Sequence, residues 1–465
     1  MTGAAGALAG RLKGLAGEAG SLKRRALSAG VWRLGGFGAT QVLRLGSNLV
    51  LTRLLAPEDF GVAALIFTIH AGLVMMTDVG IRPSVVRSDH GETPAFLRTA
   101  WTIQLAQLAS VAGLVLLAAA GLDAFQRAFG RGETVLADPR LPSLLAASAG
   151  IVLLMGLRSA NLALMQRRLQ VKPLIYIELL THVVTIIVTI ACAVVWRSVW
   201  AIVFGAAVGK AFFAILSHVR LPGPSMRLAW HTSHAAEIWR YGKWIAGASA
   251  SGFVINQGDR LILSALLDAR SFGLFAIAMV WIEAFRRIGQ MPIQQIVQPS
   301  LNEVRRDRPW DLARVFFRLR RLTDLILLLA AGAVLVLAQA GLERLYDPRY
   351  HEAAPLIAIL AVGMASLRYR VLGQVAQAFG DSRSLFFATA MSVPWVFLGV
   401  PAAFRAFGIE GAMLAVALIP LLPAPKLLLA ARRHVPIDLR REWAVLVAVP
   451  VLGAAWAFLA VPRLF

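Results

Sequence analysis

The sequence predicts an all-α protein that crosses a membrane many times, and three observations support this class. Hydrophobic residues make up 58% of the chain and charged residues 15%, with a mean hydropathy of +0.69, whereas soluble domains are about 45–50% apolar and about 25% charged. Apolar segments close to the roughly 20 residues that cross hydrocarbon recur along the whole chain. They lack the two-residue alternation of a membrane barrel, so we expect helices, which satisfy their own backbone hydrogen bonds in lipid.

Thirteen apolar segments are long enough to be expected as spans. They cover residues 28–54, 60–80, 95–121, 141–165, 173–196, 198–219, 240–266, 271–298, 322–342, 353–379, 384–404, 409–431 and 443–462. The last segment is the most weakly defined, so the number of spans is expected to be twelve to fourteen. The side on which the C-terminus lies stays open.

A stretch near the start of the chain recurs 212 residues later without a gap. Phe60-Gly61 corresponds to Phe272-Gly273, and the match extends back to Trp32 and Trp244. Paired tryptophans, glycines and a matched turn indicate a true internal repeat. Each copy then holds six helices, and an even number gives both copies the same orientation. We therefore expect two six-helix lobes related by a pseudo-twofold axis along the membrane normal, plus about one extra C-terminal helix.

This repeat divides the chain into five parts. We expect a cytoplasmic N-terminal segment that is amphipathic or disordered (1–27), an N-lobe with helices 1–6 (28–219), a cytoplasmic linker (220–239), a C-lobe with helices 7–12 (240–431), and a basic loop with the extra helix (432–465). The linker carries Pro222, Gly223 and Pro224, which are typical of a connection rather than a helix.

The distribution of Lys and Arg predicts the orientation of the chain. Basic residues gather before the first span and in alternate connections, and they are densest in residues 305–321 and 432–441. By the positive-inside rule these parts face the cytoplasm, so we expect a multi-pass protein of the bacterial inner membrane with a cytoplasmic N-terminus. The net charge of +22 is spread over short interhelical loops, which fits contact with anionic lipid heads and argues against a nucleic-acid partner.

Several cations lie deep within the predicted spans. A charge at this depth costs about 2.5–3.5 kcal/mol on insertion scales, so it is expected to face an aqueous cavity or a partner. Acidic residues at similar depth are few, namely Glu178, Asp259 and Glu283. We therefore predict a substrate-binding cationic cavity formed by Arg33, Arg44, Arg158, Lys210, Arg286, Arg287, Arg368 and Arg370.

Helical spacing adds polar faces beside these cations. Steps of three and four residues place side chains on one face of a helix. The faces are Glu283, Arg287, Gln290, Gln294 and Gln298; Ser366, Arg370, Gln374 and Gln377; Arg33, Thr40, Arg44 and Asn48; and Ser249, Gly252, Asn256 and Asp259. For any single residue an internal salt bridge is an equal alternative, as for Glu283 with Arg287 at i,i+4. Arginine suits an anion site, because its fork grips phosphate or carboxylate and keeps its charge when desolvated.

The sequence offers little for catalysis or cofactor binding. It has no phosphate-binding loop of the GxxxxGK[ST] kind, so ATP hydrolysis is not encoded. It has no HExxH motif and no cysteine–histidine cluster, and its single Cys192 lies in an apolar run. We therefore expect no cofactor, no metal site and no catalytic residues.

Four motifs resemble one known family. RLGSNLVLTRLLAPEDFGVAALIF (Arg44 to Phe67) and TDVGIRPSVVRSD (Thr77 to Asp89) resemble the first two helices of Wzx-type polysaccharide flippases. That family belongs to the superfamily that also holds MATE drug exporters and lipid II flippases. LYDPRYHEAAPLIAILAVG (Leu345 to Gly363) and FGIEGAMLAVAL (Phe407 to Leu418) resemble its ninth-to-tenth and eleventh-to-twelfth connections. The resemblance covers nearly the whole chain, although thirteen segments depart from the common twelve or fourteen.

The resemblance implies a transporter rather than an enzyme. Its expected activity is to flip an undecaprenyl-pyrophosphate-linked oligosaccharide repeat unit to the periplasmic leaflet, by alternating access, for exopolysaccharide, capsule or O-antigen synthesis. Its expected partners are this lipid-linked oligosaccharide, a coupling proton or sodium ion, and a polymerase and chain-length regulator of the same pathway.

Two alternatives remain. A membrane polysaccharide polymerase or ligase would need an acceptor-binding surface outside the membrane, and the longest predicted periplasmic connection, Leu122 to Arg140, is short for that purpose. A MATE-like drug exporter would favour intramembrane carboxylates that bind cations, whereas the deep charges here are mainly positive.

Overall fold

The computed structural model describes residue 32 and residues 35–129, 132–440 and 442–444. Every regular element in these residues is a helix, and they contain no strand. The predicted all-α class is therefore confirmed. The N-terminal segment 1–27 and nearly all of the thirteenth predicted span, 443–462, lie outside the described residues.

The first half of the chain supplies helices up to α8. Residues 35–54 form a leading helix. It is followed by α2 (Pro57–Met76), α3 (Ile81–Arg87), α4 (Pro94–Phe129), η1 (Val135–Ala137), α5 (Leu141–Gly156), α6 (Asn161–Arg167), α7 (Val171–Trp196) and α8 (Trp200–Val219). The expected linker ends earlier than residue 239, because α9 already begins at Thr232.

The second half follows the same general plan. Its elements are α9 (Thr232–Leu266), α10 (Ala269–Pro292), the π-helical turn η2 (Ile293–Val297), α11 (Gln298–Asp307), η3 (Pro309–Asp311), α12 (Leu312–Leu345), η4 (Pro348–Tyr350), α13 (Ala353–Ser366), η5 (Leu367–Tyr369), α14 (Arg370–Ala378), α15 (Ser382–Ala390), α16 (Ser392–Pro394), the π-helical turn η6 (Trp395–Gly399), α17 (Val400–Leu418), η7 (Ile419–Leu421) and α18 (Ala424–Arg432). The helical run of α17 is interrupted at Phe407 and at Gly408, which has a φ of +65°. Glycine tolerates this left-handed conformation, which separates the predicted spans 384–404 and 409–431.

The helices confirm a polytopic membrane protein. Among the described residues, seven helical stretches are long and apolar enough to cross a membrane, or eight if the bent pair of α5 and α6 is one span. This number is lower than thirteen for three reasons. The run Arg383–Arg432 is one stretch of 50 residues, and the leading helix, α9 and α10 are not among the seven. Nearly all of the segment 443–462 lies outside the described residues.

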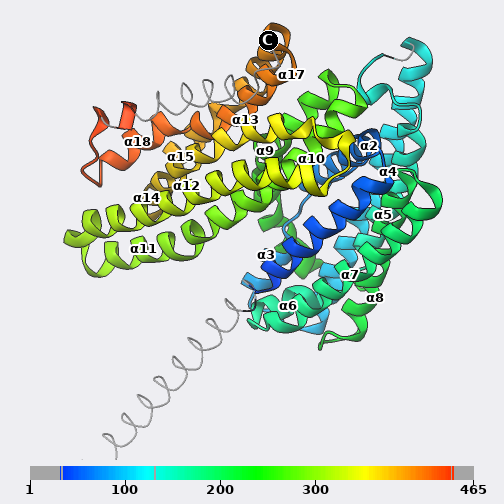
Figure 1. Ribbon diagram of the computed structural model, residues 1–465. Coiled ribbons are helices and arrows are strands. Elements are labelled where there is room, and N and C mark those ends of the chain that lie inside the picture. Colours follow the sequence, from blue (N-terminus) through cyan, green and yellow to red (C-terminus); the bar gives the residue numbers. More distant parts are fainter. Residues whose placement is uncertain (1–31, 33–34, 130–131, 441, 445–465) are drawn as a thin grey trace, which may run out of the picture.

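The two halves of the chain lie on two sides of the molecule. Figure 1 shows α4, α5, α7 and α8 gathered on one side and α11 to α18 on the other. The halves meet where α2 packs against α9 and α10. The first-half helices pack mainly on one another, as α4 does on α5 and α7 on α8, and α12, α13 and α17 do the same in the second half.

The paired glycines of the sequence repeat face each other where α2 crosses α10. A Cβ atom added at Gly61 would collide with the carbonyl group of Ala269, and one added at Gly273 would collide with that of Pro57. Gly273 and Ala269 each lie 212 residues after Gly61 and Pro57, so the two contacts are the same contact made in both directions. Reciprocity of this kind is the property of a twofold axis, and it supports the predicted pseudo-twofold repeat.

Two further hydrogen bonds connect the halves beside this crossing. The backbone N–H of Val135, in η1 of the first half, donates to the carbonyl oxygen of Leu267 at 2.8 Å. The hydroxyl of Tyr350, in η4 of the second half, donates to the carbonyl oxygen of Leu55 at 2.8 Å. Leu55 and Leu267 are again 212 residues apart, so each half satisfies the same carbonyl group of the other. We call this set of contacts the cross-half seal.

Candidate functional site

The second half of the bundle encloses a cavity of about 330 Å³ that holds several predicted site residues. Asp259 of α9 and Arg286 of α10 line it from one side. Arg370, Gln374 and Gln377 line it from α14, at successive steps of four and three residues, as the predicted helix face requires. We call this space the second-half cavity.

The two arginines of the second-half cavity stand without a bonded partner among the described residues. Arg370 lies deep in the bundle, yet its side chain stays accessible because it projects into the cavity. The charged group that acts on it most is Arg286, which has the same sign. Asp259 acts on Arg286 at a distance, but one of its oxygens already accepts the backbone N–H of Arg260. The cavity therefore carries excess positive charge.

The first half encloses a larger cavity of about 470 Å³ with a mixed charge. Arg158, from the break between α5 and α6, and Lys210, from α8, supply the positive charges. Glu178 and His182 of α7 also line it. We call this space the first-half cavity.

A third cavity of about 260 Å³ lies between the two halves. The leading helix contributes Asn48, α2 contributes Phe60 and Ala64, and α9 contributes Arg260. Phe60 and Phe272, which precede Gly61 and Gly273, also line it, so it borders the cross-half seal. We call it the inter-half cavity.

Charged residues connect the halves beside this third cavity. Arg44 of the leading helix donates from Nη2 to the carbonyl oxygen of Val280 in α10 at 3.1 Å, while its buried Nε has no partner in the described structure. Glu283 of α10 forms ion pairs with Arg260 of α9 and with Arg287 at 3.9 Å. The expected Glu283–Arg287 pair thus exists, but Arg260 is the closer partner.

Several predicted site residues lie apart from these cavities or outside the description. Arg368 donates to Asp324 of α12 at 2.8 Å and does not line any of the three cavities. Gln290 has a buried Nε2 without a partner in the described part of the chain. The residue Arg33 and the side chains of Asn256 and Gln294 lie outside the described residues. Their predicted role stays a prediction.

A broken helix stands at the same place in each half. In the first half α5 and α6 are bent by 52° at the break that holds Arg158. In the second half η5 separates α13 from α14, which begins at Arg370. Leu141 and Ala353, the first residues of α5 and α13, are 212 residues apart. Irregular helices in membrane proteins commonly line binding cavities, and each break here delivers an arginine to the cavity of its own half.

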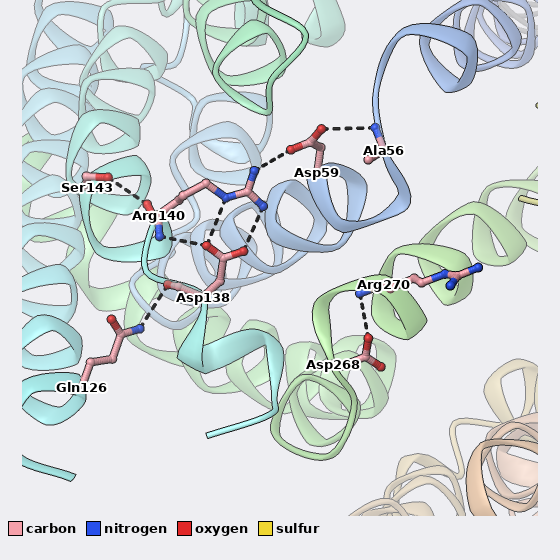
Figure 2. A network of polar contacts seen from close by, with 8 residues as sticks. All are labelled: Ala56, Asp59, Gln126, Asp138, Arg140, Ser143, Asp268 and Arg270. Carbon is pink, nitrogen blue, oxygen red and sulfur yellow. Dashed lines mark hydrogen bonds and ion pairs between the residues drawn. The ribbon is translucent and has the colours of Figure 1, made fainter. Parts of the chain in front are cut away.

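A polar network around Arg140 lies next to the start of α2, near the cross-half seal (Figure 2). Arg140 donates to Asp59 at 2.8 Å and makes a forked pair with Asp138 at 3.1 and 2.9 Å. The hydrogen bond to Asp138 raises the pKa of Arg140 above its ordinary value. Asp59 also accepts the backbone N–H of Ala56, which caps the start of α2. Asp268 caps α10 at the matching position.

The sequence interpretation missed one member of the site. Arg260 lies near the end of the predicted span 240–266, a position from which a long basic side chain can reach the lipid heads. In the structure it is half-buried, lines the inter-half cavity and pairs with Glu283. One signal was available, because Arg260 follows Asp259 on a helix whose other polar residues had already been counted as a cavity face.

The described residues hold no cluster of three or more potential metal ligands. The side chains that line the cavities can recognise a ligand by charge and hydrogen bonding. Arg158, Lys210, Arg286 and Arg370 can bind phosphate or carboxylate groups.

Comparison with solved structures identifies the fold. The lipid II flippase MurJ, in an inward closed conformation, superposes with a TM-score of 0.63 at 11% identity, over 93% of this chain and 99% of that one. An inward-facing MATE family transporter of the MOP superfamily gives 0.58 at 11% identity, over 85% and 94%. A MOP superfamily transporter from Pyrococcus furiosus gives 0.53 at 15% identity, over 90% and 96%. The fold is that of the MOP superfamily transporters.

The family model for "Polysaccharide biosynthesis protein" matches residues 50–355. The chain belongs to this family, which confirms the resemblance that its motifs predicted. No curated protein matches the chain.

Proposed function

We propose that this protein flips an undecaprenyl-pyrophosphate-linked oligosaccharide repeat unit across the bacterial inner membrane for exopolysaccharide, capsule or O-antigen synthesis. The observation that carries the proposal is the set of cations that stand unpaired among the described residues, Arg158, Lys210, Arg286 and Arg370, in cavities of a membrane-embedded bundle. A deep cation without a partner is costly in a membrane protein, so an anionic ligand is the expected compensation. Membership of a polysaccharide biosynthesis family makes a lipid-linked glycan the favoured anion.

The arrangement of the halves supports a rocking movement. Transporters built from two pseudo-symmetric lobes expose a central site alternately to each side of the membrane. In this protein the cross-half seal would close one end while the substrate enters from the other. Arg44 and Arg287, which lie where the halves meet, would contact the pyrophosphate, and the lipid tail would stay in the bilayer. Breaking the seal would then release the glycan.

The same proposal includes orientation and partners. The basic connections support a cytoplasmic N-terminus, and the seal would then lie at the periplasmic end. A proton or sodium gradient, or consumption of the product outside, would give direction to the transport. The polymerase and the chain-length regulator of the pathway would be its functional partners.

The decisive experiment separates transport from catalysis. Deletion of the gene should make lipid-linked repeat units accumulate in the cytoplasmic leaflet, with loss of the polymer outside. The purified protein should neither lengthen nor transfer glycan. Glycosyl transfer by the pure protein would favour a polymerase or ligase instead. Export of cationic drugs by the intact protein would favour the MATE-like alternative, which the positive cavities argue against.

A further inference from the structure

Helix α12 (Leu312–Leu345) has one exposed face that changes from apolar to basic along its length. Spacings of three, four and eight residues place side chains on one face of a helix. On this face lie Arg314, Arg318, Arg321, Leu325, Leu328 and Val336. The apolar members are 53%, 68% and 70% exposed, as expected where a helix long enough to cross a membrane contacts hydrocarbon. The arginines continue the same face toward the start of the helix.

The spacing along α12 gives the depth of each arginine in the membrane. Leu322 is the exposed leucine nearest the start of the helix. Because each residue adds about 1.5 Å, Arg321 and Arg318 lie about 1.5 and 5–6 Å beyond it, and Arg314 lies about 12 Å beyond it. The headgroup layer of one leaflet is about 5–7 Å deep, since a bilayer measures about 40–45 Å with its headgroups and about 30 Å without them. Arg318 and Arg321 are therefore at headgroup depth, and Arg314 lies past it.

The two arginines at headgroup depth have no acidic partner in the described part of the chain. Arg314, by contrast, pairs with Asp311 at 3.3 Å. Arg321 donates only from Nε, to the carbonyl oxygen of Phe317 at 3.4 Å. Arg318 and Arg321 are exposed and three residues apart, so they are neighbours on the helix surface. Their forked guanidinium groups can therefore donate together to one phosphate group.

The internal repeat indicates that the helix itself does not need this arginine pair. At the offset of 212 residues, the two positions correspond to Ala106 and Ala109, which are also exposed. With alanine at both places, α4 still forms a helix of 36 residues (Pro94–Phe129). A requirement of the fold would apply to both halves, so the pair has a role that belongs to the second half alone.

We propose that Arg318 and Arg321 form a binding site for the headgroup phosphate of an anionic phospholipid in the cytoplasmic leaflet. A lipid fits better than a soluble phosphate or an acidic protein, because the same face of α12 continues as an apolar stripe along which acyl chains can lie. Anionic lipids are concentrated in the cytoplasmic leaflet. The site is separate from the three cavities, and its leaflet follows from the orientation included in the proposed function.

The test measures the lipid preference of the purified, full-length protein. Phosphatidylglycerol is titrated onto the delipidated protein in detergent, and the bound fraction is measured by native mass spectrometry, with phosphatidylcholine as the neutral comparison. The unaltered protein should bind phosphatidylglycerol more tightly. Each arginine near a lipid surface contributes about a fivefold preference, so the double variant Arg318→Gln with Arg321→Gln should weaken phosphatidylglycerol binding by about 25-fold. Binding of phosphatidylcholine should change much less.

Two further variants control for charge and for folding. Arg314→Gln removes an exposed arginine from the same face, but one that lies past the headgroups and pairs with Asp311, so phosphatidylglycerol affinity should stay nearly unchanged. Arg318→Lys with Arg321→Lys keeps both charges and loses only the forks, so it should retain most of the affinity. All variants should keep the helicity and the lipid-free thermal midpoint of the unaltered protein. If the double glutamine variant does not, each single glutamine variant should show about a fivefold loss.

Three outcomes would overturn the lipid site. They are equal affinities of the unaltered protein for the two lipids, an unchanged phosphatidylglycerol affinity in the glutamine variants, and the same loss in Arg314→Gln as in Arg318→Gln. Displacement of the lipid by inorganic phosphate at equal concentration would show that a soluble phosphate is the ligand instead. None of these results would affect the flippase proposal, which depends on accumulation of lipid-linked units in the deletion strain.

Discussion

A single methyl group at Gly273 should push the two halves of the protein apart. The Cβ of alanine at this position would lie 2.6 Å from the carbonyl carbon of Pro57, whereas carbon atoms pack at about 3.5–4.0 Å. The obstacle is backbone, so no side-chain rotation can relieve the clash. Relief requires α2 and α10 to separate by about 1 Å, which would weaken the hydrogen bonds of the cross-half seal.

The size of the effect follows from this clash. Overpacking of a tight contact costs about 1–3 kcal/mol, and this cost falls only on the state in which the seal is closed. A difference of about 1–3 kcal/mol corresponds to a shift of about 5- to 150-fold between two states. Gly61→Ala should shift the population in the same direction, because its Cβ would meet the backbone of Ala269 and Gly273.

Cysteine labelling from the periplasm can measure the shift. In a Cys192→Ser background, Ala64→Cys places a reporter in the inter-half cavity beside the seal. Adding Gly273→Ala should increase its rate of reaction with a membrane-impermeant maleimide by about 5- to 150-fold. Gly113→Ala in α4 is the matched control, since a Cβ there meets no atom within 4 Å. Labelling at the unaltered rate in a Gly273→Ala protein of normal yield would refute the reasoning.

Three further predictions use other contacts. Tyr350→Phe leaves the buried carbonyl oxygen of Leu55 without its donor, so the free energy of unfolding should fall by about 1–3 kcal/mol; an unchanged thermal midpoint would contradict this. Arg260→Gln should lower protein yield, because it removes the closer partner of Glu283, whereas Arg287→Gln should leave the yield normal and impair export; equal yields for both would show that Glu283 does not depend on Arg260. Cysteine labels after His90 and Gln170 should react from the cytoplasm, and labels near Glu133 and Arg349 from the periplasm; labelling near Glu133 from the cytoplasm alone would reverse the assigned orientation.

Sequence periodicity predicted the helices well because an apolar segment in lipid has to satisfy its own backbone hydrogen bonds, and a helix does so. The described parts of the first twelve predicted segments are mainly helical, with short turns between helices in some of them, and a spacing of 212 residues already paired Gly61 with Gly273. The repeat could not show that these glycines touch each other. That contact depends on how the halves dock, which no local pattern encodes.

The cavity residues could be predicted as a set but not by location. Helical spacing indicates which residues of one helix share a face, yet it does not reveal which neighbouring helix lies opposite. We therefore expected one cavity. Among the described residues, Arg286 and Arg370 line the second-half cavity, Arg158 and Lys210 line the first-half cavity, and Arg44, Arg287 and Arg368 line none of the three. The sequence could have shown that Arg368 and Arg370 do not line the same cavity. Residues two apart on a helix point away from each other, and here Arg370 enters a cavity while Arg368 pairs with Asp324.

The exchange of hydrogen bonds in the cross-half seal has a consequence for biogenesis. Leu55 receives its donor from Tyr350, which lies 295 residues later in the chain. At a translation rate of about 5–20 residues per second, this donor reaches the ribosome exit about 15–60 s after Leu55 has been synthesised. During that interval the turn at Leu55 must persist in the translocation machinery or at the lipid surface without its native partner. This contact between the halves therefore forms only after the second half has been made as far as Tyr350.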